Sequence, residues 1–188
     1  DFPKISLPQV TVFGIDANDP VGITRAMDIS TRHIDFGGKV LITDRLFQGR
    51  EGYSRFCIKE MRKYVHTDYV LIIHSDGYVQ NPYAWSDEFL KYDYIGALWE
   101  WYSENRNGNG GFSLRSKKFL EAIAVLDIRE YHPEDDVICR HWRPVLESRF
   151  GIKFAPDDVC RKFSIESYKV APPNNEYKGQ FGFHGYSV

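Results

Sequence analysis

Residues Tyr69–Gly77 read YVLIIHSDG, and the first five of them form the clearest buried-strand signal in the chain. A continuous apolar run of this length is typical of a parallel strand that is covered on both faces. Similar runs lie upstream at Val10–Gly14 (VTVFG) and Lys39–Thr43 (KVLIT). Apolar residues at helical spacing separate the three runs. The first half of the chain therefore predicts a doubly wound α/β unit, in the order strand, helix, strand, helix, strand.

The two helices of this unit have different sequence signals. The first is expected to begin at Pro20 with Asp19 as its N-cap, because proline suits the first helical position and aspartate accepts hydrogen bonds from free N–H groups. Its apolar spacing continues to Ile34, and Gly37-Gly38 is expected to end it. The apolar face of the second helix consists of Tyr53, Phe56, Cys57, Met61 and Tyr64.

The second half of the chain predicts shorter elements. Strands are expected at Tyr94–Ala97 and Phe112–Leu114, on either side of a polar loop. Ser116 is the expected N-cap of one helix. Residues Asp135–Phe150 are expected to form another helix, which Pro144 would kink. The Gly-rich aromatic segment near the end of the chain is not assigned to a sheet.

Length and composition restrict the class of protein. The 188 residues suffice for one domain, expected over residues 1–188, and a first residue of Asp1 rather than Met predicts a chain cut from a longer protein. A net charge of −2 disfavours nucleic-acid binding. No apolar run approaches the ~20 residues of a membrane helix, and no secretion signal is visible. The three cysteines fit neither a disulfide framework nor a zinc site, which indicates reduced thiols in the cytoplasm.

An acidic residue follows each of the three predicted parallel strands. These strands end in Gly-Ile-Asp (14–16), Thr-Asp-Arg (43–45) and His-Ser-Asp-Gly (74–77). Because ligands of open α/β sheets bind at the carboxyl ends of strands, Asp16, Asp44 and Asp76 are candidate binding residues. Gly77 would let a ligand approach the backbone closely. The alternative is that these aspartates are ordinary turn or cap residues.

Three further segments carry candidate chemistry. A divalent cation at Asp76 needs a second protein ligand, for which His184 is the candidate; the alternative is an exposed histidine in a flexible terminal segment. The Gly-rich segment 108–116 lacks the Gly-Lys-Ser/Thr of a phosphate-binding P-loop. Its glycines would instead let the backbone pass close to a substrate, and the alternative is a tight turn before a strand. Residues 134–136 (EDD) place three carboxylates at a helix start, where the helix dipole favours acids in any case. A catalytic role requires one of them to accept a proton from a hydroxyl.

The order of these motifs resembles that of a known family. The motifs are GID (14–16), HSDG (74–77), NPYAW (81–85), YIGA (94–97), GNGGFSLRS (108–116), EDDVICR (134–140) and FGFHG (181–185). Together they resemble the small GT-A-type glycosyltransferases of bacterial polysaccharide systems and of large algal viruses that glycosylate their own capsid. The resemblance extends from about Val10 to Gly185, and GNGGFSLRS and the Glu-Asp pair are its most specific parts.

This resemblance implies a GT-A-like fold, in which a mixed, nucleotide-binding sheet is flanked by helices. It also implies a nucleotide-sugar donor, with UDP as the default nucleotide, and an acceptor hydroxyl on a glycan or glycoprotein. The 14–16 motif would lie against the nucleoside, and Tyr53 and Arg55 would lie near the phosphates. The donor-binding residues are thus expected to be Gly14, Ile15, Asp16, Asp44, Tyr53, Arg55, Ser75, Asp76, Gly110 and Gly111.

The resemblance further implies Mn²⁺ or Mg²⁺ held by Asp76 and His184, with Asp135 as the general base of an inverting transfer. Glu134 would then bind acceptor or sugar hydroxyls, and Asp136 would favour the helix dipole. In one respect the chain departs from the family, because the first aspartate of its Asp-x-Asp motif is His74 here. This departure predicts a metal that rests on Asp76 and His184 alone and binds weakly without nucleotide.

Two other functions fit the same residues. A non-catalytic nucleotide- or glycan-binding module would keep the aromatic surface without needing a base. A metal-dependent phosphoester hydrolase would use the same carboxylates, but that class commonly holds two metals. Aromatic residues make up 15% of the chain. Six of them are candidates for stacking on sugar rings, and about half of these six are expected to belong to the core instead: Tyr78, Tyr83, Trp85, Trp99, Trp101 and Tyr102.

Overall fold

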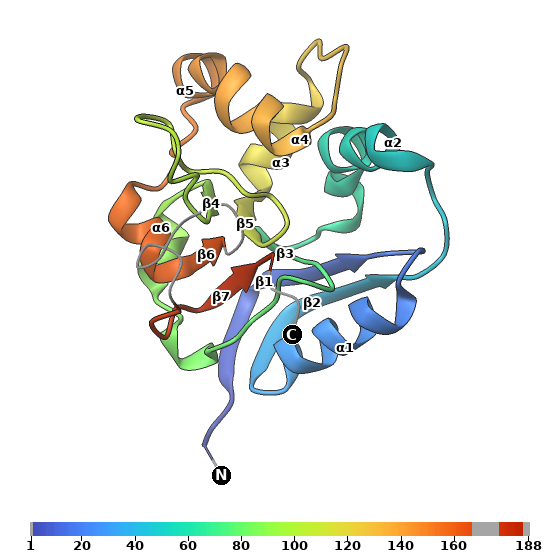
Figure 1. Cartoon of the computed structure of the whole chain (residues 1–188), viewed down its shortest axis with the longest axis vertical. Helices are drawn as coiled ribbons and strands as arrows, with labels where there is room; N and C mark the ends of the chain where they lie inside the picture. Colours follow the sequence, from blue (N-terminus) through green and yellow to red (C-terminus); the bar gives the residue numbers. More distant parts are fainter. Residues whose placement is uncertain (1, 167–176, 186–188) are drawn as a thin grey trace.

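A five-stranded mixed sheet forms the centre of the computed structural model, which describes residues 2–166 and 177–185 (Figure 1). Its strand order is β2-β1-β3-β5-β4. The strands are β1 (Ile5–Ile15), β2 (Ile34–Ile42), β3 (Tyr69–Ile73), β4 (Tyr94–Gly96) and β5 (Ser113–Ser116). β1 is parallel to both β2 and β3, whereas β5 is antiparallel to β3 and β4. A second, two-stranded parallel sheet pairs β6 (Ser164–Glu166) with β7 (Gly182–His184).

Helices connect the strands and cover both faces of the sheet (Figure 1). The α-helices are α1 (Pro20–Thr31), α2 (Gly49–Arg55), α3 (Lys117–Ala124), α4 (Glu134–Asp136), α5 (Arg143–Phe150) and α6 (Asp157–Phe163). The π- and 3₁₀-helical segments are η1 (Phe56–Glu60), η2 (Met61–Tyr64), η3 (Pro82–Ala84), η4 (Asp87–Lys91) and η5 (Val137–His141). Across the described residues, each helix is too short or too polar to cross a membrane.

Alternation along the central strands divides the core into two layers. Successive side chains of a strand point to opposite faces, so Leu71 and Ile73 pack with α1, while Val70 and Ile72 pack with η1, η2 and α3. All four side chains are at most 1% exposed, and burying each contributes roughly 1.5–3 kcal/mol. The predicted doubly wound α/β fold is therefore confirmed, and β3 has the bounds expected from its apolar run.

The expected end of the first helix at Gly37-Gly38 is wrong. Helix α1 begins at Pro20 as predicted, with the Asp19 side chain accepting from Gly22 N at 2.9 Å, but it ends at Thr31. Both glycines lie inside β2, and a Cβ at position 37 would lie 1.8 Å from the Pro8 carbonyl oxygen. They therefore permit the close approach of β1, whose register against β2 shifts at this point.

Other predicted boundaries move by a few residues. The second helix spans α2, η1 and η2 in sequence, although Tyr64 at its end is 39% exposed. Ser116 caps α3 as expected, through a 3.0 Å bond from Phe119 N. The last predicted helix starts at Glu134 rather than Asp135 and is divided into α4, η5 and α5, with Pro144 in the first turn of α5.

The segment that contains His184 is a docked strand rather than a flexible terminal segment. Phe181 O accepts hydrogen bonds from Gln80 N and Asn81 N at 2.9 and 3.1 Å, and Gly185 N donates to Asp76 O at 2.8 Å. The Phe181 side chain is fully buried, in contact with the rings of Phe112, Phe163 and Phe89. Strand β7 is thus fixed against the segment that follows β3, more than 100 residues away in sequence.

Gly182→Ala should weaken the docking of β7. A Cβ at position 182 would lie 2.1 Å from Phe112 Cε1, inside the packed aromatic cluster, so the ring or the strand must shift. Overpacking of this kind costs about 1–3 kcal/mol of unfolding free energy, which urea denaturation measures. The exposed Ser148→Ala in α5 is the control, and its unfolding free energy should stay within about 0.5 kcal/mol of the wild-type value. A Gly182→Ala protein as stable as the control would contradict the packing described.

Candidate functional site

A cleft of about 780 Å³ lies at the carboxyl ends of β1, β2 and β3. It is bounded by these strand ends, the loop before α2, and β7. Seven of the residues expected to bind donor or metal line it: Ile15, Asp16, Asp44, Tyr53, Ser75, Asp76 and His184. The structure therefore gathers residues from both ends of the sequence around one opening.

Some of the expected donor-binding residues lie outside the cleft lining. Gly14 is buried within β1, where a Cβ would lie 3.0 Å from the Ile23 side chain. Arg55 is on the exposed side of α2, and its guanidinium lies 3.5 Å from the Glu60 carboxylate. Gly110 and Gly111 lie close to Asp135 and His184, respectively.

A tight turn presents the acidic residue that follows β3. His74 N donates to Gly77 O at 2.7 Å, and Gly77 N donates to His74 O at 3.2 Å, so Ser75 and Asp76 form the tip. The absence of a side chain at Gly77 is required by packing within the protein. A Cβ there would lie 2.8 Å from His184 Cδ2 and 2.9 Å from Phe183 O, so its absence permits the approach of β7.

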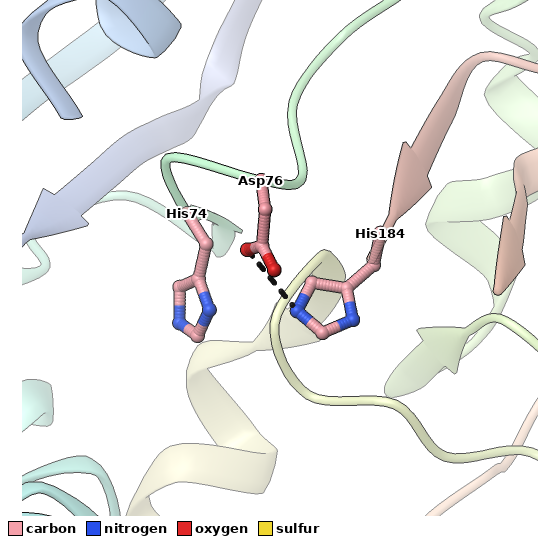
Figure 2. Close-up of side chains that lie close together, drawn as sticks. All are labelled: His74, Asp76 and His184. Atoms are coloured by element: carbon pink, nitrogen blue, oxygen red, sulfur yellow. Dashed lines mark ion pairs between the residues drawn. The ribbon is translucent and has the colours of Figure 1, made fainter. Parts of the chain in front are cut away.

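Three potential metal-ligating side chains converge beside this turn (Figure 2). His74, Asp76 and His184 each offer one ligand atom, and these three atoms lie within 4.8 Å of one another. His184 Nε2 lies 3.5 Å from Asp76 Oδ1. Two nitrogens and a carboxylate oxygen at this spacing form a donor set that suits a divalent cation. His74, which stands where the family's Asp-x-Asp motif has its first aspartate, is thus part of the cluster.

Each imidazole has one ring nitrogen within hydrogen-bonding distance of another side chain. His184 Nδ1 lies 2.8 Å from Glu166 Oε2, and the Glu166 side chain is 3% exposed. His74 Nε2 lies 2.8 Å from the Tyr53 hydroxyl. Glu166 had no sequence signal, because its place beside His184 depends on the pairing of β6 with β7.

The two histidines differ in their acid–base behaviour. Burial, together with the neighbouring His184, lowers the pKa of His74 to about 4, so its imidazole is neutral at neutral pH. Burial also disfavours the charged form of His184. The hydrogen bond from His184 to Glu166 and the negative charges of Glu166 and Asp76 outweigh that effect, so the pKa of His184 is raised above its ordinary value.

Asp135 is anchored against the Gly-rich loop. Its Oδ2 accepts from Gly110 N at 3.1 Å, and its Oδ1 accepts from Asp136 N at 2.9 Å. On the same loop, a Cβ at Gly111 would lie 2.2 Å from His184 Nε2. Asp135 and the metal-ligating cluster therefore flank one short stretch of backbone.

The expectation that Glu134 binds acceptor or sugar hydroxyls is not compatible with its position. Its carboxylate is buried and lies 3.0 Å from Arg115 Nη2, a guanidinium that is fully buried. Burial raises the pKa of Glu134, although the charge of Arg115 opposes this shift. Arg115 also donates to Ser113 Oγ at 3.1 Å, which ties the pair to β5. Glu134 therefore belongs to a buried ion pair beneath the Gly-rich loop.

Aromatic residues expected at a sugar-binding surface divide between core and surface. Tyr78 and Trp99 are buried, whereas Tyr83 and Trp101 are about half exposed. The remaining two are partly buried: the Trp85 ring packs edge-on against Phe181, and the Tyr102 ring lies under the Arg140 guanidinium.

Three basic residues line the cleft besides the predicted binding residues. Arg45 comes from the loop between β2 and α2, Arg50 from the first turn of α2, and His132 from the segment before α4. Arg45 is the residue after Asp44, just beyond the end of β2 at Ile42, so the rule that located Asp44 could have included it. For His132 no local pattern was available, since its Nδ1 is brought 3.2 Å from Ser54 Oγ only by tertiary packing.

Comparison with known proteins gives a family and a fold. A family model described as "Protein of unknown function (DUF5672)" matches residues 39–184. A search of curated proteins finds no match. The structure is similar to that of a glycosyltransferase involved in the glycosylation of the major capsid of PBCV-1, with a TM-score of 0.64 and 15% identity over 95% of this chain and 94% of that chain. An active-site mutant of LgtC also matches, with a TM-score of 0.44 and 12% identity over 95% of this chain and 88% of that chain. The first similarity establishes a GT-A-like fold, as predicted.

Glu134→Ala should destabilise the protein strongly. It removes the partner of Arg115 and leaves a fully buried guanidinium uncompensated, which costs about 3–5 kcal/mol. The double variant Arg115→Met/Glu134→Leu removes both charges and should recover most of that loss. Chemical denaturation of the two variants measures the difference, with Asp136→Asn as the neighbouring control. Similar stability of Glu134→Ala and Asp136→Asn would show that the ion pair is unimportant.

Proposed function

We propose that this chain, which belongs to the DUF5672 family of proteins of unknown function, is a glycosyltransferase. It would transfer a sugar from a nucleotide-diphosphate donor, with UDP as the default nucleotide, to a hydroxyl of a glycan or glycoprotein. The observation that carries the proposal is the cluster of His74, Asp76 and His184 in the lining of the cleft, with Asp135 hydrogen-bonded to the Gly-rich loop that His184 contacts. The fold shared with a capsid glycosyltransferase supports it.

The cleft suits a nucleotide diphosphate in size and charge. Its volume of about 780 Å³ is within the usual range of roughly 300–1,000 Å³ for small-molecule sites. Asp16 would contact the nucleoside, and its Oδ1 is held by Asn18 N and Asp19 N, each at 2.8 Å. Arg45 and Arg50, which line the same cleft, would supply positive charge to the diphosphate.

Asp76 and His184 would hold the divalent cation, Mn²⁺ or Mg²⁺. The residues fit such an ion, because a carboxylate oxygen and an imidazole nitrogen face each other at 3.5 Å beside a loop that has no side chain at Gly111. When bound, the cation would stabilise the negative charge that develops on the leaving diphosphate. The protein contributes the fixed positions of these two side chains, one on the 74–77 turn and one on β7.

Asp135 would accept the proton of the acceptor hydroxyl. Its carboxylate is fixed by the N–H groups of Gly110 and Asp136, so its position is set before substrate binds. A base on the face of the sugar opposite the leaving group gives inversion at the anomeric carbon, which is the outcome we propose. We propose that the reaction takes place in the cytoplasm, and the three free, buried cysteines support a reducing compartment.

The phosphoester hydrolase is the weaker candidate. That class commonly uses two metals ~3.5–4 Å apart. Residues 2–166 and 177–185 contain one cluster of three or more metal-ligating side chains, and it has a single carboxylate. A non-catalytic binding module differs from the transferase only in turnover, so activity measurements separate the two.

Nucleotide release from a panel of nucleotide sugars with Mn²⁺ tests the proposal. We expect release of free nucleotide diphosphate from at least one donor, and loss of metal-dependent release in Asp76→Ala. Asp28→Ala, which removes an exposed carboxylate on α1, should behave as wild type. Calorimetric titration of UDP should show metal-dependent binding that Asp76→Ala loses. Binding without turnover would favour the module, and cleavage of simple phosphoesters would favour the hydrolase.

Asp135→Asn should lower transfer while keeping donor affinity. The amide has no proton-accepting carboxylate, and loss of a general base costs at least ~10²-fold in rate. Asp136→Asn is the matched control one residue away and should transfer sugar at close to the wild-type rate. Initial rates and donor dissociation constants of both variants decide the matter. Near-normal transfer by Asp135→Asn would remove it from the role of base.

A further inference from the structure

The metal-ligating cluster contains two imidazoles, whereas the family's Asp-x-Asp motif supplies two carboxylates. His74 stands at the first position of that motif, and His184 joins it from β7 (Figure 2). The two imidazole rings have centroids 5.5 Å apart. This donor set differs chemically from two carboxylates, since imidazole nitrogen is a softer ligand than carboxylate oxygen.

His184 is oriented by a buried carboxylate. Glu166 Oε2 lies 2.8 Å from Nδ1, and this hydrogen bond keeps a proton on Nδ1 and directs the lone pair of Nε2 toward Asp76. Glu166 is opposite His184 in the parallel pairing of β6 with β7, so backbone hydrogen bonding fixes the distance between the two residues. A carboxylate behind a ligating histidine is the usual arrangement in protein metal sites.

His74 is oriented in a similar way by a hydroxyl. The Tyr53 hydroxyl lies 2.8 Å from Nε2 of His74 and can accept the proton of that nitrogen, which leaves the lone pair on Nδ1. The ring of Tyr53 also packs against that of His74, with centroids 5.7 Å apart. Both histidines therefore have one ring nitrogen engaged by the protein and the other available as a ligand.

We infer that His74 is a third protein ligand and that the site favours ions that accept imidazole nitrogen over Mg²⁺: Zn²⁺ and Co²⁺ most strongly, and Mn²⁺ more weakly. Glu166 and Tyr53 are positioning residues for the two imidazoles. This inference rests on the proposed function for its substrate, because the remaining coordination positions would be completed by water and the donor diphosphate. It specifies which of the two proposed ions the site holds, since Mg²⁺ prefers oxygen ligands.

Metal binding by the whole chain, free of any histidine tag and without nucleotide, tests the inference. The absorption bands of Co²⁺ report nitrogen coordination, and titration gives its dissociation constant. We expect Co²⁺ to bind and a 100-fold excess of Mg²⁺ to leave its bands unchanged, whereas Zn²⁺ should displace it. His74→Asp, which restores Asp-x-Asp, should weaken Co²⁺ binding at least ~10-fold and allow Mg²⁺ to compete. His66→Asp, at an exposed histidine outside the cluster, is the control and should bind Co²⁺ as wild type.

Glu166 is tested separately because it would act only through His184. Its loss should weaken metal binding although its own side chain is not proposed as a ligand. Glu166→Ala should weaken Co²⁺ binding about 10–100-fold, and Glu166→Gln, which keeps an oxygen acceptor for Nδ1, should lose less. Equal Co²⁺ affinity in the wild type and His74→Asp, absence of Co²⁺ binding, or equal competition by Mg²⁺ and Zn²⁺ would overturn the inference. None of these measurements uses sugar transfer, so the inference can fail while the transferase stands, and the reverse.

Discussion

The docking of β7 against the segment that follows β3 is the constraint on which the rest of the site depends. It buries Phe181 and Phe183 and closes backbone hydrogen bonds to Gln80 and Asn81, and it carries His184 to Asp76. Burial of two phenylalanine side chains contributes several kcal/mol, roughly 1.5–3 each, which is enough to keep the strand in place. The meeting of His184 with Asp76 therefore depends on the hydrophobic packing behind β7.

Where two backbone segments of this site approach closely, there is no room for a side chain between them. Where β7 passes the 74–77 turn, there is no room for a Cβ at Gly77, and His184 Nε2 occupies the space where a Cβ at Gly111 would lie. A wider separation would leave the Asp76 carboxylate and the two imidazoles too far apart to share an ion. The glycines are thus part of the geometry of the site although they contribute no ligand.

A buried ion pair lies beside the Gly-rich loop and helps to fix the position of Asp135. Arg115 and Glu134 form a buried pair that joins β5 to α4, and Asp135, the next residue, accepts the N–H of Gly110. Buried pairs of this kind add little net stability, but removal of one partner is costly. The pair is therefore suited to fixing the position of α4, and with it Asp135, relative to the metal-ligating cluster.

Local patterns in the sequence determined the parallel strands, the caps Asp19 and Ser116, and the convergence of Asp16, Asp44 and Asp76 at one edge. Each of these depends on residues a few positions apart or on the general rule that parallel strands end at the same edge. The likeness of several motifs to a family predicted His184 beside Asp76, and the two side chains do lie together. Tertiary structure alone decided that Gly37 and Gly38 belong to β2, since the reason is a contact with Pro8 in another strand.

The pairing of Glu166 with His184, the convergence of His74 on the cluster and the burial of Glu134 were likewise decided by tertiary structure alone. Such contacts join segments 18 to 110 residues apart in sequence. Whether a carboxylate faces solvent, a substrate or a buried guanidinium is set by what packs around it, and no spacing rule records that.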